Sequence, residues 1–316
     1  MLQIRVLNDD DVKRLLDLDA LIEGLADGFR ALTLGEVSAP PRNGVDVPGG
    51  FLLSMVAHAP RHPMGVKLVS VFHDNARVGL PGHLALISLF DERTGAPTAV
   101  MNGTYITAMR TAGGAALSTR LLARPDSRTL AIVGAGVQGE SHLRMVTRVR
   151  GFTAIRIASA SLDDARRVAA LDPRARAMAS AEGAVKGADV VCLCTNSATP
   201  VVQREWLSPG THLTSVGYRP PGSEVARDIL ADARIFVESR QAAYAAPPAG
   251  CAELAGLDPE AGAELGEVLL GHRPARQTAL ELTLYKSMGH AMEDLVAAHL
   301  VHERAKHDGA GTMVAL

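Results

Sequence analysis

The sequence contains little cysteine, little lysine and no long hydrophobic run. Its three cysteines are too few for a disulfide framework, so we expect a protein of a reducing compartment. No apolar stretch approaches the roughly 20 residues needed to span a bilayer. Charged residues close to Met1 interrupt the hydrophobic core that a secretory signal requires. We therefore expect a cytoplasmic protein that has no membrane segment.

An excess of charge of one sign is also lacking. The 32 Lys and Arg residues nearly balance the 34 Asp and Glu residues, and the net charge is −2. This balance gives no electrostatic reason to bind nucleic acid or an anionic membrane, so we expect neither partner. The hydrophobic fraction of 47% excludes a disordered chain, and 316 residues suffice for two domains with sizeable cores.

Hydrophobic spacing predicts a mixed first part of the chain. Residues 1–35 show helical spacing of apolar side chains, with Asp17 or Asp19 as the N-cap. Short β-rich runs between glycines and prolines over residues 51–102 predict an antiparallel sheet. A helix rich in small residues is expected over 105–122.

Strands and helices alternate from Arg128 onwards. This order predicts an α/β fold with a doubly wound parallel sheet, which is the Rossmann architecture. Cys192 and Cys194 fall in one of its apolar strands, where core packing is the simpler interpretation and metal binding is the alternative. The final helix, expected over 290–306, is predicted to return to the first domain.

A complete G-x-G-x-x-G pattern follows the first strand of this second part. It runs from Gly134 to Gly139, after the apolar strand TLAIV and before a predicted helix, which is the context of a dinucleotide-binding loop. Glycines there allow a tight turn and a close approach of backbone to a pyrophosphate, and amide N–H groups at the helix start face the anion. A purely structural glycine turn is the alternative.

The end of the next strand indicates which nicotinamide cofactor is preferred. An NAD site usually has an acid there, bound to the ribose 2′-hydroxyl. This chain has Ser159 and Ser161, and the first acid is Asp163. The serines can donate to a 2′-phosphate and no carboxylate repels it, so we expect NADP(H) to be preferred. Arg166 and Arg167 follow one or two turns later.

Three basic residues are candidates for substrate chemistry. Lys67 interrupts the apolar strand MGVKLVSVF, and a buried lysine has a lowered pKa that suits proton transfer near neutrality. Arg110 lies among small residues that leave room for a ligand, and Arg42 is a possible second carboxylate clamp. The alternatives are an edge-strand lysine that reaches solvent and structural salt bridges for the arginines.

Four residues could be drawn as a metal site but do not form a known pattern. These are His58, His62, His73 and Asp74, and their spacing matches no compact ligand motif. We expect surface or supporting roles for them, and no metal site in this protein.

The segments that carry these candidates together resemble the ornithine cyclodeaminase/mu-crystallin family. The resemblance runs in order through most of the chain, and the MRTA element joined at this distance to GAGVQ is more specific than the glycine loop alone. The matching segments are PPRNG, MGVKLVSVFHDN, LFDERTGAPTAVMNG, YITAMRTAGGAA, ARPDSRTLAIVGAGVQGESH, CTNSATPVV, SVGYRPPGSE and YKSMGHAMEDL.

The resemblance implies a homodimer of two-domain chains. A mixed α+β substrate-binding and dimerisation domain would comprise residues 1–112 and 286–316, and a Rossmann dinucleotide-binding domain would comprise 113–285. By position, Lys67 matches the catalytic lysine, and Arg42 and Arg110 match the arginines that hold the substrate carboxylate. The cofactor-binding positions implied are Thr111, Gly134, Ala135, Gly136, Val137, Gln138, Thr195, Asn196, Val216, Ser287 and Gly289.

One position departs from the cyclodeaminase pattern. Members with that activity resemble one another in having an aspartate where this chain has Tyr218, and a neutral phenol is a poor substitute for a carboxylate that accepts a proton. Tyr218 is still expected to line the substrate site. The neighbouring Arg219-Pro220 is more similar to the reductase members.

The function expected from these observations is NAD(P)H-dependent oxidoreduction at the C=N or CH–NH bond of an amino or imino acid. The enzyme would be a ketimine or cyclic imine reductase, or an amino acid dehydrogenase, in amino acid metabolism. The alternatives are an ornithine- or lysine-type cyclodeaminase that uses NAD⁺ catalytically, a biosynthetic enzyme that forms C–N bonds, and a binding protein without activity.

Overall fold

The computed structural model describes residues 2–72, 74–246 and 250–316, and it divides into two compact units. The first comprises residues 1–110 and 289–316, and the second comprises 111–288. The domain ends predicted from the sequence are residues 112 and 286. His73, one of the four residues considered for a metal site, lies outside the described residues.

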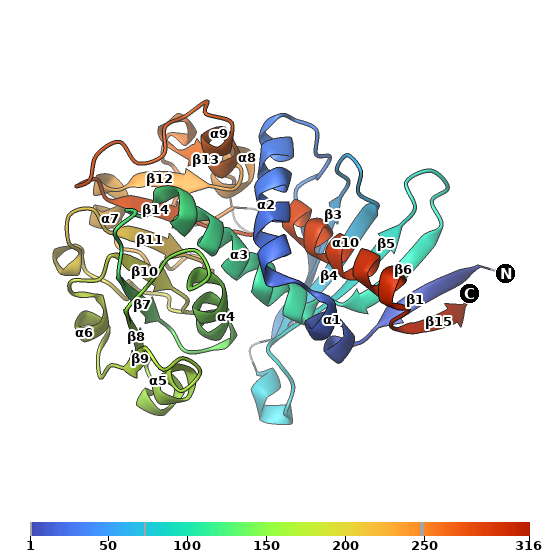
Figure 1. Cartoon of the computed structure of the whole chain (residues 1–316), viewed down its shortest axis with the longest axis horizontal. Coiled ribbons are helices and arrows are strands. Elements are labelled where there is room, and N and C mark those ends of the chain that lie inside the picture. Colours follow the sequence, from blue (N-terminus) through green and yellow to red (C-terminus); the bar gives the residue numbers. More distant parts are fainter. Residues whose placement is uncertain (1, 73, 247–249) are drawn as a thin grey trace. The chain divides into compact units, whose positions relative to one another are not determined.

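A seven-stranded mixed sheet forms the centre of the first unit (Figure 1). Its order is β15-β1-β6-β5-β4-β3-β2, and every pair is antiparallel except β1 with β6. The antiparallel sheet expected over residues 51–102 is confirmed by β3 to β6. The strands are β1 (Gln3–Leu7), β2 (Asn43–Val47), β3 (Gly50–Ala57), β4 (Met64–Phe72), β5 (His83–Phe90), β6 (Pro97–Asn102) and β15 (Thr312–Ala315).

The prediction that residues 1–35 are helical is wrong for Gln3–Leu7, which form strand β1. Segment Gln3–Leu7 pairs with β6 and with β15, so the N- and C-terminal strands lie side by side (Figure 1). Tertiary pairing determines the conformation of this short segment. Helix α1 (Asp9–Leu15) follows, and then α2 (Leu18–Thr33). The N-cap of α2 is Asp17, whose carboxylate accepts from the backbone N–H groups of the second and third residues of the helix.

Helix α10 (Ala291–Asp308) packs against α2 and against one face of the mixed sheet, at β3, β4 and β5 (Figure 1). Glycines make these contacts close. A Cβ at Gly28 would overlap the Met292 sulfur, and one at Gly65 would lie 2.8 Å from the Leu295 side chain. The expected last helix is therefore confirmed, and it belongs to the first unit.

The opposite face of the mixed sheet is apolar and exposed. Cross-strand pairs such as Val45 with Leu52 and Leu68 with Leu86 lie on this face. Large hydrophobic side chains at such positions are at least one-third exposed, and those on β2 to β5 are Val45, Val47, Leu52, Val56, Met64, Leu68 and Leu86.

The second unit contains a parallel sheet and the part of helix α3 (Thr104–Leu122) that follows Arg110. The expected small-residue helix is confirmed, and α3 is buried along nearly its whole length. The sheet has the order β13-β12-β14-β11-β10-β7-β8-β9, and all of its pairs are parallel (Figure 1). The fold class is therefore α/β with a Rossmann-type sheet, as expected.

Strands β7 and β10, at the centre of the parallel sheet, are buried on both faces, which explains their continuous apolar sequences. The strands are β7 (Thr129–Val133), β8 (Ala154–Ala158), β9 (Ala175–Ala177), β10 (Val190–Leu193), β11 (His212–Ser215), β12 (Arg234–Val237), β13 (Ala263–Glu264) and β14 (Thr283–Lys286). The helices are α4 (Val137–Val146), α5 (Leu162–Ala169), α6 (Ala181–Val185), α7 (Arg227–Asp232), α8 (Arg240–Ala243) and α9 (Leu265–Leu269).

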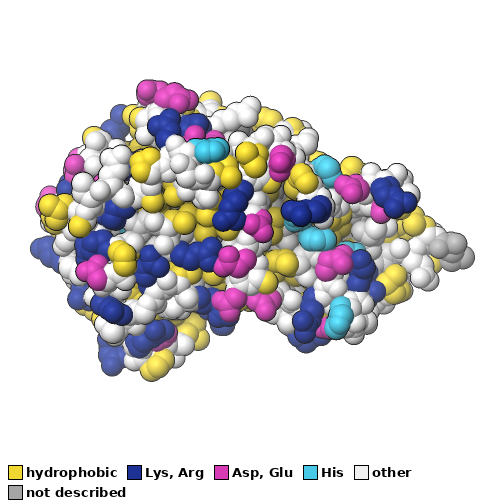
Figure 2. Space-filling model, turned by 45° about the horizontal axis from the view of Figure 1, so that its top comes forward, with side chains coloured by type: hydrophobic (Ala, Val, Ile, Leu, Met, Phe, Trp, Pro, Cys, Tyr) yellow, Lys and Arg dark blue, Asp and Glu magenta, His cyan; other side chains and the backbone are white. Residues whose placement is uncertain are grey.

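No helix within residues 2–72, 74–246 and 250–316 has both the length and the hydrophobicity that crossing a membrane requires. Basic and acidic side chains both occur across the face shown in Figure 2.

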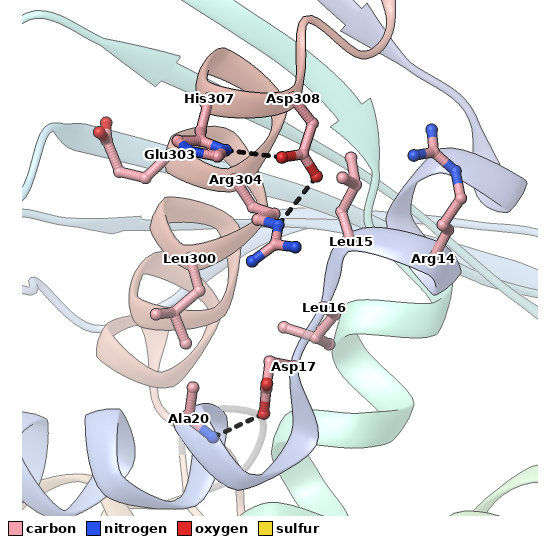
Figure 3. A pocket seen from close by; sticks show the side chains of 10 residues that line it. All are labelled: Arg14, Leu15, Leu16, Asp17, Ala20, Leu300, Glu303, Arg304, His307 and Asp308. Atoms are coloured by element: carbon pink, nitrogen blue, oxygen red, sulfur yellow. Dashed lines mark hydrogen bonds and ion pairs between the residues drawn. The ribbon is translucent and has the colours of Figure 1, made fainter.

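A cleft of about 590 Å³ lies in the first unit where α1, the start of α2 and the end of α10 meet (Figure 3). Its charged side chains are partly exposed and pair with close neighbours, as Arg304 and His307 do with Asp308. Because each of these charged side chains is already paired with a neighbouring group, the cleft has no feature that points to a ligand. The lining residues are Arg14, Leu15, Leu16, Asp17, Ala20, Leu300, Glu303, Arg304, His307 and Asp308.

Candidate functional site

The glycine loop lies at the point where the strand order of the parallel sheet reverses. Strands β8 and β10 flank β7 on its two sides, so the loops after β7 and β10 leave the sheet in opposite directions. Ligands of open parallel sheets bind at such a switch point, outside the carboxyl ends of the strands. Residues 134–136 follow β7, and Thr195 and Asn196 follow β10.

The three glycines of the loop differ in how strictly the surrounding structure requires glycine at their positions. Gly134 has a φ of +108°, and a Cβ there would overlap the Cys194 carbonyl of the neighbouring loop. A Cβ at Gly139 would overlap the Gly134 carbonyl, so helix and loop need both glycines. At Gly136, in contrast, a Cβ would meet nothing within 4 Å, and the packing of the protein does not require glycine.

The start of α4 fits a dinucleotide phosphate. Gly136 is the N-cap of α4 and has no side chain that could cap the first N–H groups of the helix. The open space at its Cα and these amide donors suit the close approach of an anion. Val137 and Gln138 form the first turn. The structure therefore agrees with the dinucleotide-binding interpretation rather than with a purely structural turn.

A buried carboxylate joins the ends of β10 and β11. One oxygen of Glu224 accepts from the Thr195 backbone N–H at 2.9 Å and from its hydroxyl at 2.7 Å. The other accepts from the Ser215 hydroxyl at 2.8 Å and from the Gly217 N–H at 2.7 Å. Glu224 is 1% exposed. Four donors fix the two strand ends that carry Thr195, Val216 and Tyr218.

A second buried network joins β11, β12 and β14. Lys286 donates to the Gly217 carbonyl at 2.6 Å and forms an ion pair with Glu253 at 3.2 Å. Glu238 accepts from the Ser287 hydroxyl at 2.6 Å. These contacts hold the carboxyl edge of the sheet rigid, which is what a precise binding site requires.

The first unit contains a buried cluster of charges around Lys67. Strand β4 lies between β3 and β5, so the alternative of an edge-strand lysine is wrong. The ammonium forms an ion pair with Asp294 at 2.7 Å, and both side chains are 2% exposed. Arg110 binds the other Asp294 oxygen at 2.9 Å and Glu293 at 2.8 Å. The structural ion pair considered for Arg110 is therefore present.

The environment of Lys67 changes the ionisation of several groups. Burial, with the charge of Arg110 next, lowers the pKa of the Lys67 ammonium, Asp294 opposes the decrease, and the resulting pKa is about 8. Burial favours protonation of Asp294, but Arg110 and Lys67 outweigh it and bring its pKa below the usual value. Burial, with Lys67 next, lowers the pKa of His83 on β5 to about 4, so His83 is neutral near pH 7.

Arg42 and Gly289 belong to the same cluster. Arg42 donates to the Gly289 carbonyl at 2.7 Å, and its charge also lowers the pKa of Lys67. Gly289 has a φ of +71°, and a Cβ there would overlap the Arg110 guanidinium. Only glycine satisfies both conditions at this position.

The structure thus gathers the expected site residues into two groups. Lys67, Arg42, Arg110 and Gly289 lie together in the first unit. In the second unit, the expected residues that follow strands β7, β8, β10, β11 and β14 are Gly134, Ala135, Gly136, Ser159, Thr195, Asn196, Val216, Tyr218 and Ser287. Thr111 is buried within α3.

Sequence reasoning assigned no role to the acids of these networks. Glu293 and Asp294 lie in the first turn of α10, where acids commonly interact with the helix dipole. Because this role is common, their position in the sequence does not indicate that they contact Lys67 and Arg110. Glu224 ends the segment SVGYRPPGSE but had no assigned role, and Glu238 and Glu253 lie in segments without a motif. Lys286 could have indicated the second network, because it is one of only five lysines and ends a buried strand.

Metal-binding geometry is not seen in the described part of the chain. No group of three or more His, Cys, Asp or Glu side chains there could hold a metal ion. Cys192, Cys194 and Cys251 are free and buried, and burial raises the pKa of the Cys192 thiol to about 12.

The parallel sheet, the glycine loop and the helix start at its switch point define a protein of the Rossmann dinucleotide-binding class. The particular family follows from sequence comparison. Residues 3–309 match the ornithine cyclodeaminase/mu-crystallin family, and the chain belongs to this family.

Individual relatives agree with this assignment. Ketimine reductase mu-crystallin of Mus musculus is 38% identical over 274 residues, which cover 85% of this chain and 86% of that protein. Δ1-Pyrroline-2-carboxylate reductase of Thermococcus litoralis, solved with NADH and L-proline, has a TM-score of 0.92 at 31% identity, covering 98% of this chain and 99% of that one. An archaeal alanine dehydrogenase dimer with bound NAD has a TM-score of 0.93 at 28% identity, with 100% of both chains covered.

Proposed function

We propose that this protein is a nicotinamide-dependent reductase of the C=N bond of a small imino acid, able to run in reverse as an amino acid dehydrogenase. The observation that carries the proposal is the cluster of Lys67 with Arg110 and Arg42, in a chain that also has a dinucleotide-binding loop. The imine reductases and the amino acid dehydrogenase among its relatives support the same reaction class.

Each residue of the cluster has a defined task in this reaction. Arg42 and Arg110 bind the substrate carboxylate, and Lys67 Nζ gives a proton to the imine nitrogen. The nicotinamide, when bound, supplies hydride to the imine carbon. Glu224 and Lys286 keep the strand ends that carry Thr195, Val216 and Tyr218 in place beside the cofactor. In this account the first unit binds substrate and the second binds cofactor.

NADP(H) is the proposed preferred cofactor. Strand β8 ends at Ala158, and Ser159 follows it where an NAD-specific site would have an acid. Arg167 on α5 donates to the Ala135 carbonyl of the glycine loop at 2.7 Å, so a cation lies next to that loop. Both features favour a cofactor with an additional phosphate.

The pH dependence of the reaction provides a test. Lys67 is protonated below its pKa of about 8. We therefore expect kcat/KM for imine reduction to fall about tenfold per pH unit above pH 8, and kcat/KM for oxidation of the amino acid to rise through the same range. Steady-state rates between pH 6 and 10 measure both limbs. A profile without a limb near pH 8 in either direction would count against Lys67 as the proton donor.

The exposed apolar face of the mixed sheet is the proposed homodimer contact. Monomeric proteins rarely expose apolar patches of this extent. Leu68→Glu places a charge at the middle of the face, and we expect it to convert the dimer into a folded monomer at micromolar concentration. Light scattering after gel filtration measures the mass. Leu171→Glu, at an exposed position in the second unit, is the control and should leave the dimer intact. A dimeric Leu68→Glu variant would exclude this face.

The cyclodeaminase reaction is not proposed, because Tyr218 offers no carboxylate where that reaction needs one.

We also propose a cytoplasmic location, where reduced cofactor is available and the three free cysteines stay reduced.

A further inference from the structure

Four charged side chains are buried together in the first unit without solvent to stabilise them. Lys67, Arg110, Asp294 and Glu293 are each at most 5% exposed, and their formal charges cancel. Burying ion pairs generally adds little stability compared with an apolar core, so such a cluster in a fold with ample apolar packing requires another reason. Proximity to the proposed reaction site supplies one.

Asp294 bridges both cations of this group. Its Oδ2 lies 2.7 Å from Lys67 Nζ, and its Oδ1 accepts from Arg110 Nε at 2.9 Å. Glu293, the preceding residue, contacts Arg110 Nη1 at 2.8 Å. Asp294 thus fixes the separation between the proton donor and one arm of the carboxylate clamp.

We propose that Asp294 is a positioning residue for the reaction, which holds Lys67 and Arg110 in one arrangement and keeps the lysine in its cationic form until the substrate accepts the proton. This inference rests on the proposed function of the site. A carboxylate on the first turn of α10 is suited to this task because the helix N-terminus stabilises its negative charge.

The charges that act on Lys67 come from every element around it. Arg110 on α3 and Arg42, before β2, disfavour the ammonium, and Asp294 on α10 favours it. Glu293 is bound to Arg110, and His83 on β5 is neutral near pH 7. Removing the charge of Asp294 leaves Lys67 buried beside two arginines, so the lysine should lose its proton at a much lower pH.

The test is an NMR titration of Lys67 that does not depend on turnover. The chain has only five lysines, so labelling with ¹³Cε-lysine gives few signals, and the signal missing from Lys67→Met identifies Lys67. We expect the apparent pKa of Lys67 in Asp294→Asn to be about 1–3 below that of the parent, the range that one close opposite charge produces.

Glu293→Gln is the matched control. It neutralises the neighbouring acid on the same helix, which pairs with Arg110, whereas the charges that act on Lys67 are those of Arg110, Asp294 and Arg42. It should therefore move the Lys67 titration much less than Asp294→Asn does. Equal titrations of Lys67 in the parent and in Asp294→Asn would overturn the proposal.

Asp294→Glu is a second test of the proposal, which applies if Asp294→Asn does not fold. It keeps the charge but displaces the carboxylate, so we expect an unchanged Lys67 titration and a kcat at least tenfold lower with the substrate that the parent reduces. A kcat equal to that of the parent would overturn the positioning role. If the parent reduces no imine, the proposed function fails, whereas the NMR comparison still decides whether Asp294 controls Lys67.

Discussion

Lys67→Met is expected to lower kcat/KM for imine reduction by about 10²–10⁴-fold, the usual contribution of a positioned general acid. Methionine has a similar length and no proton to donate, so the variant removes the chemistry and little of the packing. The dissociation constant of NADPH should stay within about twofold of the parent value, because Lys67 belongs to the first unit and the glycine loop to the second. Fluorescence titration with NADPH measures it.

A variant that retains kcat/KM within a fewfold of the parent would show that Lys67 is not the proton donor. The melting temperature of the variant separates a loss of chemistry from a loss of folding. Lys186→Met is the control, because Lys186 is exposed at the end of α6 in the second unit and forms an ion pair with Glu182 at 2.5 Å. It should have the activity of the parent.

Gly136→Ala is expected to weaken cofactor binding by about ten- to hundredfold while leaving the melting temperature unchanged or slightly higher. The added methyl group meets no protein atom within 4 Å, so the fold tolerates it. A pyrophosphate on the first turn of α4 would be displaced and lose at least one hydrogen bond to a charged group, worth about 1.5–3 kcal/mol, which corresponds to the stated change in Kd.

Gly183→Ala provides the comparison for this variant. Gly183 lies in α6 of the same unit, with a backbone conformation that alanine accepts, and the nearest side-chain atom is 3.3 Å from the added carbon. Its affinity for NADPH should equal that of the parent. Unchanged affinity in Gly136→Ala would mean that the phosphates do not approach this turn.

The dinucleotide-binding loop could be predicted from the sequence because its pattern is local. The strand TLAIV, the glycines 134–139 and the following helix are consecutive, and the close contacts of Gly134 and Gly139 are within the motif or with one adjacent loop. The apolar strands of the parallel sheet were recognisable for the same reason, since both of their faces are buried.

Long-range pairing limited the rest of the prediction. Arg110 and Asp294 are 184 positions apart, and no spacing rule connects an acid in a helix start with a distant arginine. Strand β1 pairs with β15 on one side and with β6 on the other, and β14 enters between β11 and β12. Such arrangements depend on tertiary contacts that a single sequence does not display.

The assay that tests the central claim most directly mixes the purified protein with NADPH, or with NADH, and the cyclic imines pyrroline-2-carboxylate and piperideine-2-carboxylate. The absorbance of the reduced nicotinamide reports the reaction. We expect rapid, imine-dependent oxidation, faster with NADPH than with NADH. No oxidation with either cofactor, together with ammonia release from ornithine or lysine in the presence of NAD⁺, would contradict the account and establish a cyclodeaminase instead.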